Sequence, residues 1–98
     1  MLSNEQIQIN FSEGGIHVES ASHLQAEGCG GECIFVGRTR PETHQVHGSL
    51  IALEYDCYQE MAIQELHTLA QEAIDRFDVE HIKVTHSVGE VGINDASV

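Results

Sequence analysis

The 98-residue chain carries sixteen acidic and four basic side chains, and its formal net charge of −12 opposes binding to the phosphate backbone of nucleic acids. Hydrophobic residues make up 41% of the chain without long runs, which excludes a disordered chain and a transmembrane helix and predicts a single domain, residues 1–98, with a modest core. Three cysteines, an odd number, and an N-terminus without a basic and apolar signal region argue against secretion. We therefore expect a cytoplasmic protein with no membrane partner.

The N-terminal third predicts short elements separated by glycines. Residues 5–11 alternate apolar and polar side chains, which is typical of a half-buried strand. A glycine pair predicts a turn, and residues 16–18 predict a second short strand. A short helix that Ser20 or Ser22 caps should follow and end near Gly28.

The middle of the chain predicts two further strands around a loop. Residues 32–38 form a compact apolar run, and the polar residues 41–48 begin with Pro41, which prevents the preceding strand from continuing as a central one. Residues 49–56 place apolar side chains on both faces, so we expect this strand to be buried on both sides.

The C-terminal half holds the clearest pattern. From Tyr58 to about Asp78, apolar residues recur at steps of three and four, which predicts one long amphipathic helix. Residues 80–91 predict a strand, and residues 92–98 a turn into one more. The order of elements predicts an α+β domain with a mixed or antiparallel sheet and one long helix.

Arg38 and Arg40 are two of only four basic residues, and they lie two positions apart directly after Gly37. In an extended chain they project from one face at the exit of a strand, and their guanidinium groups suit bidentate binding of phosphate or carboxylate. The pattern predicts an anion site. An alternative, which the pattern leaves open, is that the arginines form surface ion pairs with acidic neighbours, namely Glu32, Glu42 or Glu54.

Cysteine and histidine residues give weaker patterns. Cys29 and Cys33 are separated by three residues rather than the two typical of redox or zinc pairs. His44 and His47, with Cys57 or His86, have only a loosely zinc-like spacing. We expect no metal site and no cofactor. We expect His86 to be a hydrogen-bonded structural histidine, Tyr55 and Tyr58 to pack in the core and at the helix entry, and Cys57 not to be a nucleophile.

Three blocks of residues resemble a known family. The chain has the patterns F-x-G-x-x-R, from Phe35 to Arg40, and L-E-Y-x-x-Y-x-x-M-A, from Leu53 to Ala62. A third block, comprising His86, Val88, Gly89, Asp95, Ser97 and Val98, matches less well, with Ser87 in place of an arginine and Asn94 in place of a glycine. Residues 31–98 thus resemble the large, catalytic subunit of molybdopterin synthase.

The resemblance implies an α/β hammerhead fold, a dimer of large subunits and a ubiquitin-like small subunit whose C-terminus carries a thiocarboxylate. It implies sulfur transfer to cyclic pyranopterin monophosphate, which yields molybdopterin for the molybdenum cofactor. Residues that match Arg38, Thr39 and Arg40 contact this anionic substrate in the family. Phe35 would help to shape the same pocket, with ordinary core packing as its alternative role.

Family members continue beyond the position of Val98 with an H-R pair, a helix and a lysine-bearing segment that supplies the principal catalytic groups. The single lysine here, Lys83, does not match these lysines, so we assign no catalytic residue and expect a truncated member or fragment that is inactive alone. We also expect exposed apolar faces at Ile82 and Val84, or at Ile51 and Leu53. The alternative function is a non-catalytic remnant that serves as a dimerisation or partner-binding module.

Overall fold

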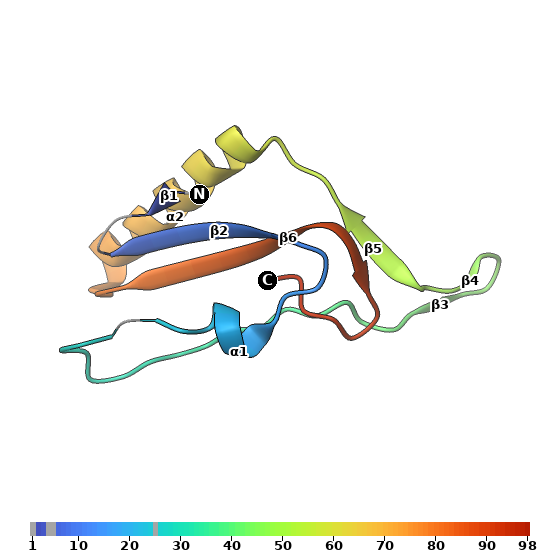
Figure 1. The fold of residues 1–98 in the computed structure, drawn as a ribbon, viewed down its shortest axis with the longest axis horizontal. Helices are drawn as coiled ribbons and strands as arrows, with labels where there is room; N and C mark the ends of the chain where they lie inside the picture. The colour runs from blue at the N-terminus through green and yellow to red at the C-terminus, as the bar shows by residue number, and fades with distance from the viewer. Residues whose placement is uncertain (1, 4–5, 25) are drawn as a thin grey trace.

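The computed structural model describes residues 2–3, 6–24 and 26–98, and within them the chain folds into a mixed sheet with one long helix (Figure 1). The described strands are β1 (Leu2–Ser3), β2 (Ile7–Glu13), β3 (Thr43–His44), β4 (Gly48–Ser49), β5 (Ala52–Tyr55) and β6 (Ile82–Gly92), and the helices are α1 (Val18–Ala21) and α2 (Gln59–Phe77). The predicted α+β class is confirmed.

Strand β6 is the centre of the main sheet, whose order is β1-β2-β6-β5. Its first part, residues 82–88, pairs in parallel with β2, and its last part, residues 89–92, pairs antiparallel with β5. Gly89 lies where the partner changes and has a φ of +82°, a conformation that a residue with a Cβ rarely adopts. The strand can therefore bend from one partner to the other.

The hydrophobic core lies between β2 and α2. Ile7 and Ile9 alternate with polar residues along β2, and both are fully buried together with Ala70 of the helix. The partly buried residues around them are Ile63, Leu66, Ile74 and Ile82. Burial of this apolar surface is what fixes the helix across the sheet. The predicted helix from Tyr58 is confirmed, and so is the predicted strand at 5–11 from Ile7 onward, residue 5 lying outside the described residues.

The C-terminal residues 95–98 lie between two other parts of the chain. Asp95 N donates to Gly92 O (3.1 Å) and reverses the chain after β6. On one side Ser87 N donates to Ser97 O (2.9 Å), and on the other Ser97 N donates to Gly37 O (2.8 Å). Single bridges join Ala96 to Ile16 and to Arg38, both antiparallel. Residues 92–98 thus contain the expected turn, but only isolated bridges in place of the expected strand.

Two of the expected strands are wrong. Residues 16–18 contribute one bridge at Ile16 before α1 begins at Val18, so the helix starts with His17 as its N-cap residue, and Ser22 lies at its C-terminal end. Residues 32–38 form only the bridge at Arg38. Their apolar sequence suits a strand, but no described segment lies beside residues 30–36 to accept and donate backbone hydrogen bonds.

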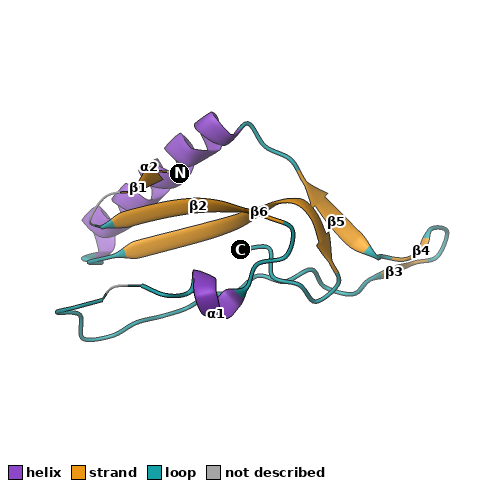
Figure 2. Cartoon of the chain, viewed as in Figure 1, coloured by secondary structure: helices purple, strands orange, loops and turns teal. Residues whose placement is uncertain are grey.

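The expected polar loop at 41–48 is instead a small hairpin. Strands β3 and β4 pair antiparallel, with Thr43 opposite Ser49, and the hairpin projects from the main body in Figures 1 and 2. His44 Nδ1 accepts hydrogen bonds from Val46 N (3.1 Å) and His47 N (3.2 Å), so a side chain fixes the turn. Sequence periodicity cannot detect strands of two residues.

The strand expected at 49–56 is present as β5, but its burial on both sides is wrong. As the edge of the described sheet, β5 has β6 as its neighbour on one side only. Ile51, just before it, is 82% exposed, and Leu53 is also exposed. Tyr58 is exposed too and donates to Glu60 Oε2 (3.0 Å), so its expected packing at the helix entry is wrong. Exposure of Ile51 and Leu53 itself was expected.

The molecule is elongated. Its Cα radius of gyration is 15.3 Å and its principal extents are 50 × 28 × 23 Å, whereas a compact domain of this length has a radius of gyration of about 13 Å. Figure 2 shows why: the β3–β4 hairpin and the loop before residue 36 extend in opposite directions. Neither helix in the described residues is long and apolar enough to cross a membrane.

Candidate functional site: the Arg38–Arg40 segment

The segment from Arg38 to Arg40 is held in place by the turn that follows β6. Thr39 N donates to Asp95 O (3.0 Å), and Asn94 N donates to Thr39 O (2.8 Å). Asn94 has a φ of +70°, and asparagine tolerates this left-handed conformation better than most residues. The turn residue that stands where the family has glycine is thus compatible with the turn.

The two arginines lie on either side of Thr39 and have different partners. Arg38 Nη1 donates to the backbone oxygen of Asn94 (2.9 Å), whereas Arg40 Nη2 pairs with Glu42 Oε1 (3.1 Å). The Arg40 and Glu42 side chains are 80% and 61% exposed. Such an exposed pair contributes little to stability and is readily exchanged. The ion-pair alternative is thus observed for Arg40 with Glu42, and not for Arg38.

The hydroxyl group of Thr39 is the unusual feature of this site. Thr39 is only 2% exposed, and its Oγ1 atom is buried without a hydrogen-bond partner among the described residues. A buried polar group without a partner destabilises the folded state by about 1–3 kcal/mol. Native structures contain few of these groups, and each one invites a search for a ligand or water that satisfies it.

A cavity of about 390 Å³ adjoins these three residues. Its lining consists of Arg38, Thr39, Arg40, Glu42, Leu50 and Leu53. Leu50 N donates to Glu42 O (2.8 Å) and closes the base of the β3–β4 hairpin, so the hairpin and β5 form the far wall. Sequence reasoning brought Arg38, Thr39 and Arg40 together but missed Leu50 and Leu53 as wall residues, since nothing in their spacing points to the arginines.

Phe35 lies apart from this cavity. It is 83% exposed and contributes instead to the lining of a larger cavity beside β6. The three candidate residues Arg38, Thr39 and Arg40 therefore meet at one cavity, and Phe35 does not join them there.

The other candidate residues are dispersed. Cys29, Cys33 and Cys57 are free thiols, and the described residues contain no group of three or more histidine, cysteine or acidic side chains placed to hold a metal ion. His86 has the structural surroundings that we expected: its Nδ1 atom lies 2.8 Å from Ser87 O, and its ring meets Tyr55 edge-on. Lys83 Nζ donates to His23 O (2.9 Å), beside the larger cavity.

A comparison with protein families identifies the family of this chain. The family model described as "MoaE protein" matches residues 11–98. The chain belongs to the MoaE family. The family resemblance inferred from the three sequence blocks is thereby confirmed.

Curated relatives carry a consistent name. The molybdopterin synthase catalytic subunit of Drosophila grimshawi is 35% identical over 98 residues, 99% of this chain and 24% of the relative. The subunit of Homo sapiens is 34% identical over 92% of this chain and 47% of the relative. The subunit of Pyrococcus abyssi is 30% identical over 82% of this chain and 53% of the relative. The MoaE chain thus spans about half, or less, of the curated relatives that it matches.

Proposed function

We propose that this MoaE chain acts in molybdopterin synthase as the large subunit, or as the part of it that binds substrate. In this role it takes part in sulfur transfer from the thiocarboxylated C-terminus of a ubiquitin-like small subunit to cyclic pyranopterin monophosphate, and it pairs with a second copy of itself. The family and the names of its relatives support the role. The cavity beside Arg38, Thr39 and Arg40 is where we place the substrate.

The buried Thr39 hydroxyl is the observation that carries this placement. Thr39 lines the cavity, and its Oγ1 atom has no partner among the described residues but is closed to solvent. A phosphate oxygen in the cavity would accept a hydrogen bond from Oγ1 once the side chain rotates toward it. The desolvation cost of that buried hydroxyl is then offset only when the anion is bound. This hydrogen bond would thus stabilise the protein with bound substrate relative to the empty protein.

The two guanidinium groups suit different tasks in this arrangement. Arg38 is anchored through Nη1 to Asn94 O, which leaves its remaining N–H groups free to donate to an anion with little loss of side-chain entropy. Arg40 holds the exposed carboxylate of Glu42, and the phosphate anion of the substrate can compete for this arginine because an exposed ion pair is weak. The substrate would thus replace Glu42 as the partner of Arg40.

Calorimetric titration with cyclic pyranopterin monophosphate tests the site. We expect Arg40→Ala to weaken binding roughly tenfold or more, because a charge-assisted hydrogen bond to phosphate is lost. Arg76→Ala is the matched control, since Arg76 is also an exposed arginine paired with a glutamate, Glu72, but on α2. Equal affinities of the Arg40→Ala and unaltered proteins would remove Arg40 from the site.

A test of Phe35 needs a separate variant. The residue lies outside the cavity that Arg38 and Arg40 line, and its part in substrate binding stays a prediction from the resemblance. Phe35→Ala weakens substrate binding in the same titration if Phe35 helps to shape the bound site. An unchanged dissociation constant assigns the side chain to another contact.

We further propose that the 98-residue chain alone does not complete sulfur transfer. Attack and release at the reacting carbon need groups that deliver protons and stabilise charge. The one lysine in the sequence, Lys83, is bonded to His23 O beside the other cavity. An assay with the thiocarboxylated small subunit and substrate should detect no molybdopterin, and full turnover would refute this proposal.

A binding module without catalysis is the second candidate function. Ile51, directly before the edge strand β5, and Leu53, within it, are exposed, and such a strand can pair with another chain. This candidate predicts that the small subunit or a second copy binds with the affinity of the unaltered protein when Arg38 and Arg40 are both replaced by alanine. The substrate-binding role predicts that substrate affinity is lost in the same double variant.

A further inference from the structure

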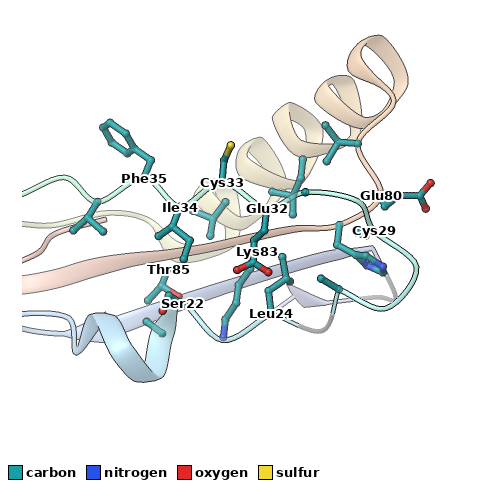
Figure 3. A pocket seen from close by; sticks show the side chains of 18 of the residues that line it. Ser22, Leu24, Cys29, Glu32, Cys33, Ile34, Phe35, Glu80, Lys83 and Thr85 are labelled. Carbon is teal, nitrogen blue, oxygen red and sulfur yellow. The ribbon is translucent and has the colours of Figure 1, made fainter.

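A cavity of about 980 Å³ lies beside β6, and Leu24, Ile34 and Phe35 are among its lining residues (Figure 3). Nothing among the described residues indicates what covers this apolar surface. The β3–β4 hairpin, in contrast, carries two histidines, His44 and His47, whose contacts define a chemistry. Neither histidine has a role in the function proposed above.

The imidazole ring of His44 closes the turn of the hairpin. Its Nδ1 atom accepts hydrogen bonds from Val46 N (3.1 Å) and His47 N (3.2 Å), and we call these two bonds the His44 contact. Asparagine and aspartate side chains bond the backbone of turns in a similar way, through an oxygen atom. The imidazole nitrogen differs from that oxygen because it can gain a proton near neutral pH.

The His44 contact requires one protonation state of the ring. A nitrogen that accepts a hydrogen bond needs its lone pair, so Nδ1 carries no proton and the hydrogen of the neutral ring lies on Nε2. In the charged ring both nitrogens carry protons, and neither can accept from a backbone N–H group. Only neutral His44 therefore makes the two bonds. The same tautomer leaves Nε2 without a lone pair for a metal ion.

The hairpin is small, so the His44 contact is a large part of what orders it. Strands β3 and β4 have two residues each and are exposed along their length. They pair at Thr43 with Ser49 and at His44 with Gly48. An isolated two-stranded hairpin is at best marginally stable in water, so the loss of two hydrogen bonds is enough to shift this one toward an open state.

The base of the hairpin belongs to the cavity beside Arg38 and Arg40. Leu50 N donates to Glu42 O (2.8 Å), and both residues line that cavity. The Glu42 side chain also pairs with Arg40 (3.1 Å). An open hairpin would thus displace part of the cavity wall together with the acidic partner of Arg40.

We propose that His44 is a pH-sensitive positioning residue: when neutral it closes the β3–β4 turn and holds the cavity wall in place, and when protonated it releases both. The order of residues 45–50 is therefore lost as the pH falls through the range in which histidine side chains gain a proton, about 8 to 5. That the cavity binds substrate rests on the function proposed above, whereas the response of the hairpin to pH does not.

Two other ionisable side chains belong to this part of the chain. The ring of His47 lies beside that of His44, with centroids 4.7 Å apart, so repulsion between the two charged rings acts in the same direction as loss of the His44 contact. Glu42, at the base, is paired with Arg40. A variant of His47 is therefore needed to separate the two histidines.

Amide protection factors, measured by solvent-exchange NMR on the full chain at pH 8 and pH 5.5, test the proposal. A protection factor divides the intrinsic exchange rate by the observed one, so it reports opening rather than the effect of pH on exchange itself. We expect the factors of Val46, His47 and Leu50 to fall by about tenfold at the lower pH. Those of Gly14 and Ile82, which bond across the main sheet, should stay unchanged.

Three variants separate His44 from other causes. His44→Asn keeps a side-chain acceptor that does not gain a proton in this range, so protection should persist at both pH values. His44→Leu removes the acceptor and should give low protection at both. His47→Gln removes the second ionisable ring and should respond to pH as the unaltered protein does.

Four outcomes would overturn the proposal. They are equal protection of the unaltered protein at both pH values, a response in His44→Asn as large as in the unaltered protein, a response that disappears in His47→Gln, and a loss at Val46 and His47 that leaves Leu50 unchanged. The last of these would show that the turn does not control the cavity wall. None of the measurements needs the substrate, so failure of this proposal and failure of the proposed function are separate results.

Discussion

At the scale of single residues, the Thr39 hydroxyl bears on two quantities, the free energy of unfolding and, in our proposal, the affinity for substrate. Its hydroxyl is buried without a partner among the described residues, while its backbone groups are fixed by Asp95 and Asn94. Such a position costs folding free energy, and in the function that we propose a bound substrate compensates this cost. The opposing effects of one substitution on stability and on affinity can therefore test the site.

The substitution Thr39→Val keeps the shape of the side chain and removes the hydroxyl. We expect the free energy of unfolding to rise by about 1 kcal/mol, because a buried group without a partner is replaced by an apolar one. Affinity for cyclic pyranopterin monophosphate should fall in the same variant. Urea denaturation measures the free energy of unfolding, and calorimetric titration measures the affinity.

Thr68→Val is the control for this pair of measurements. Thr68 is exposed on α2, and its Oγ1 atom donates to Gln64 O (2.9 Å), so its replacement should change neither quantity by more than about 0.5 kcal/mol. A loss of stability in Thr39→Val would mean that the hydroxyl is satisfied in solution and that the cavity needs no ligand to complete it.

Gly37 shows how closely the chain end packs against the arginine segment. A Cβ atom added at this glycine would lie 2.8 Å from Val98 Cγ1, a separation that requires one of the two to shift. We expect Gly37→Ala to lower the free energy of unfolding by about 1 kcal/mol, and Val98→Ala to relieve most of that loss in the double variant. Additive effects in a double-mutant cycle would show that the contact is absent.

The sequence suggests the charged residues of the candidate site more readily than the walls of its cavity. Arg38 and Arg40 stand out because cations are rare in so acidic a chain, and the family resemblance added Thr39. The pairing of Arg38 with the Asn94 carbonyl could not be predicted, because it depends on a turn more than fifty residues away in sequence. Leu50 and Leu53 reach the cavity only through the hairpin, whose two-residue strands leave no periodic signal.

At the scale of elements, α2 depends on how it ends. The helix stops at Asp78, which has a φ of 59° and lies in the left-handed conformation that glycine adopts most easily. We expect Asp78→Gly to raise the free energy of unfolding by about 0.5 kcal/mol, because the strain of a side chain in this conformation is removed. Thermal unfolding followed by circular dichroism measures the change.

Asp75→Gly serves as the matched variant inside the same helix. Asp75 lies within α2 and accepts a hydrogen bond from Gln71 Nε2 (3.1 Å). Glycine there should lower stability by about 1 kcal/mol because it costs backbone entropy in a helix interior. Changes of the same sign in the two variants would contradict a left-handed C-terminus at Asp78.

The elements that were predicted correctly are those whose own sequence carries a clear signal for a helix or a strand. The helix from Tyr58 and the described part of the strand predicted at residues 5–11 each have a periodicity that matches their buried face, and the strand at residues 80–91 is present as β6. The run at residues 32–38 has an equally apolar sequence, but only Gly37 and Arg38 pair, with residues 96–98, and residues 32–36 form no backbone hydrogen bonds with the described residues. Whether such a run becomes a strand depends on its neighbours, which periodicity does not reveal.

At the scale of the whole molecule, a small core coexists with a large exposed apolar surface. Few side chains of the described residues are fully buried, whereas Ile34, Phe35, Val46 and Ile51 are all exposed. Apolar surface of this extent favours association, while the net charge of −12 on each copy opposes it. The balance between the two terms depends on salt, because added ions screen the repulsion and leave apolar contacts intact.

We therefore expect the chain to self-associate more strongly at 0.5 M than at 0.02 M sodium chloride, over which range the screening length falls from about 20 Å to about 4 Å. Sedimentation equilibrium over a range of protein concentrations measures the association. If β5 forms the contact, Ile51→Lys should weaken association at high salt, because a charged side chain on an edge strand opposes pairing. The control Val46→Lys changes an exposed side chain of the hairpin tip instead. A monomer at both salt concentrations would show that the exposed apolar residues do not bring copies of this chain together.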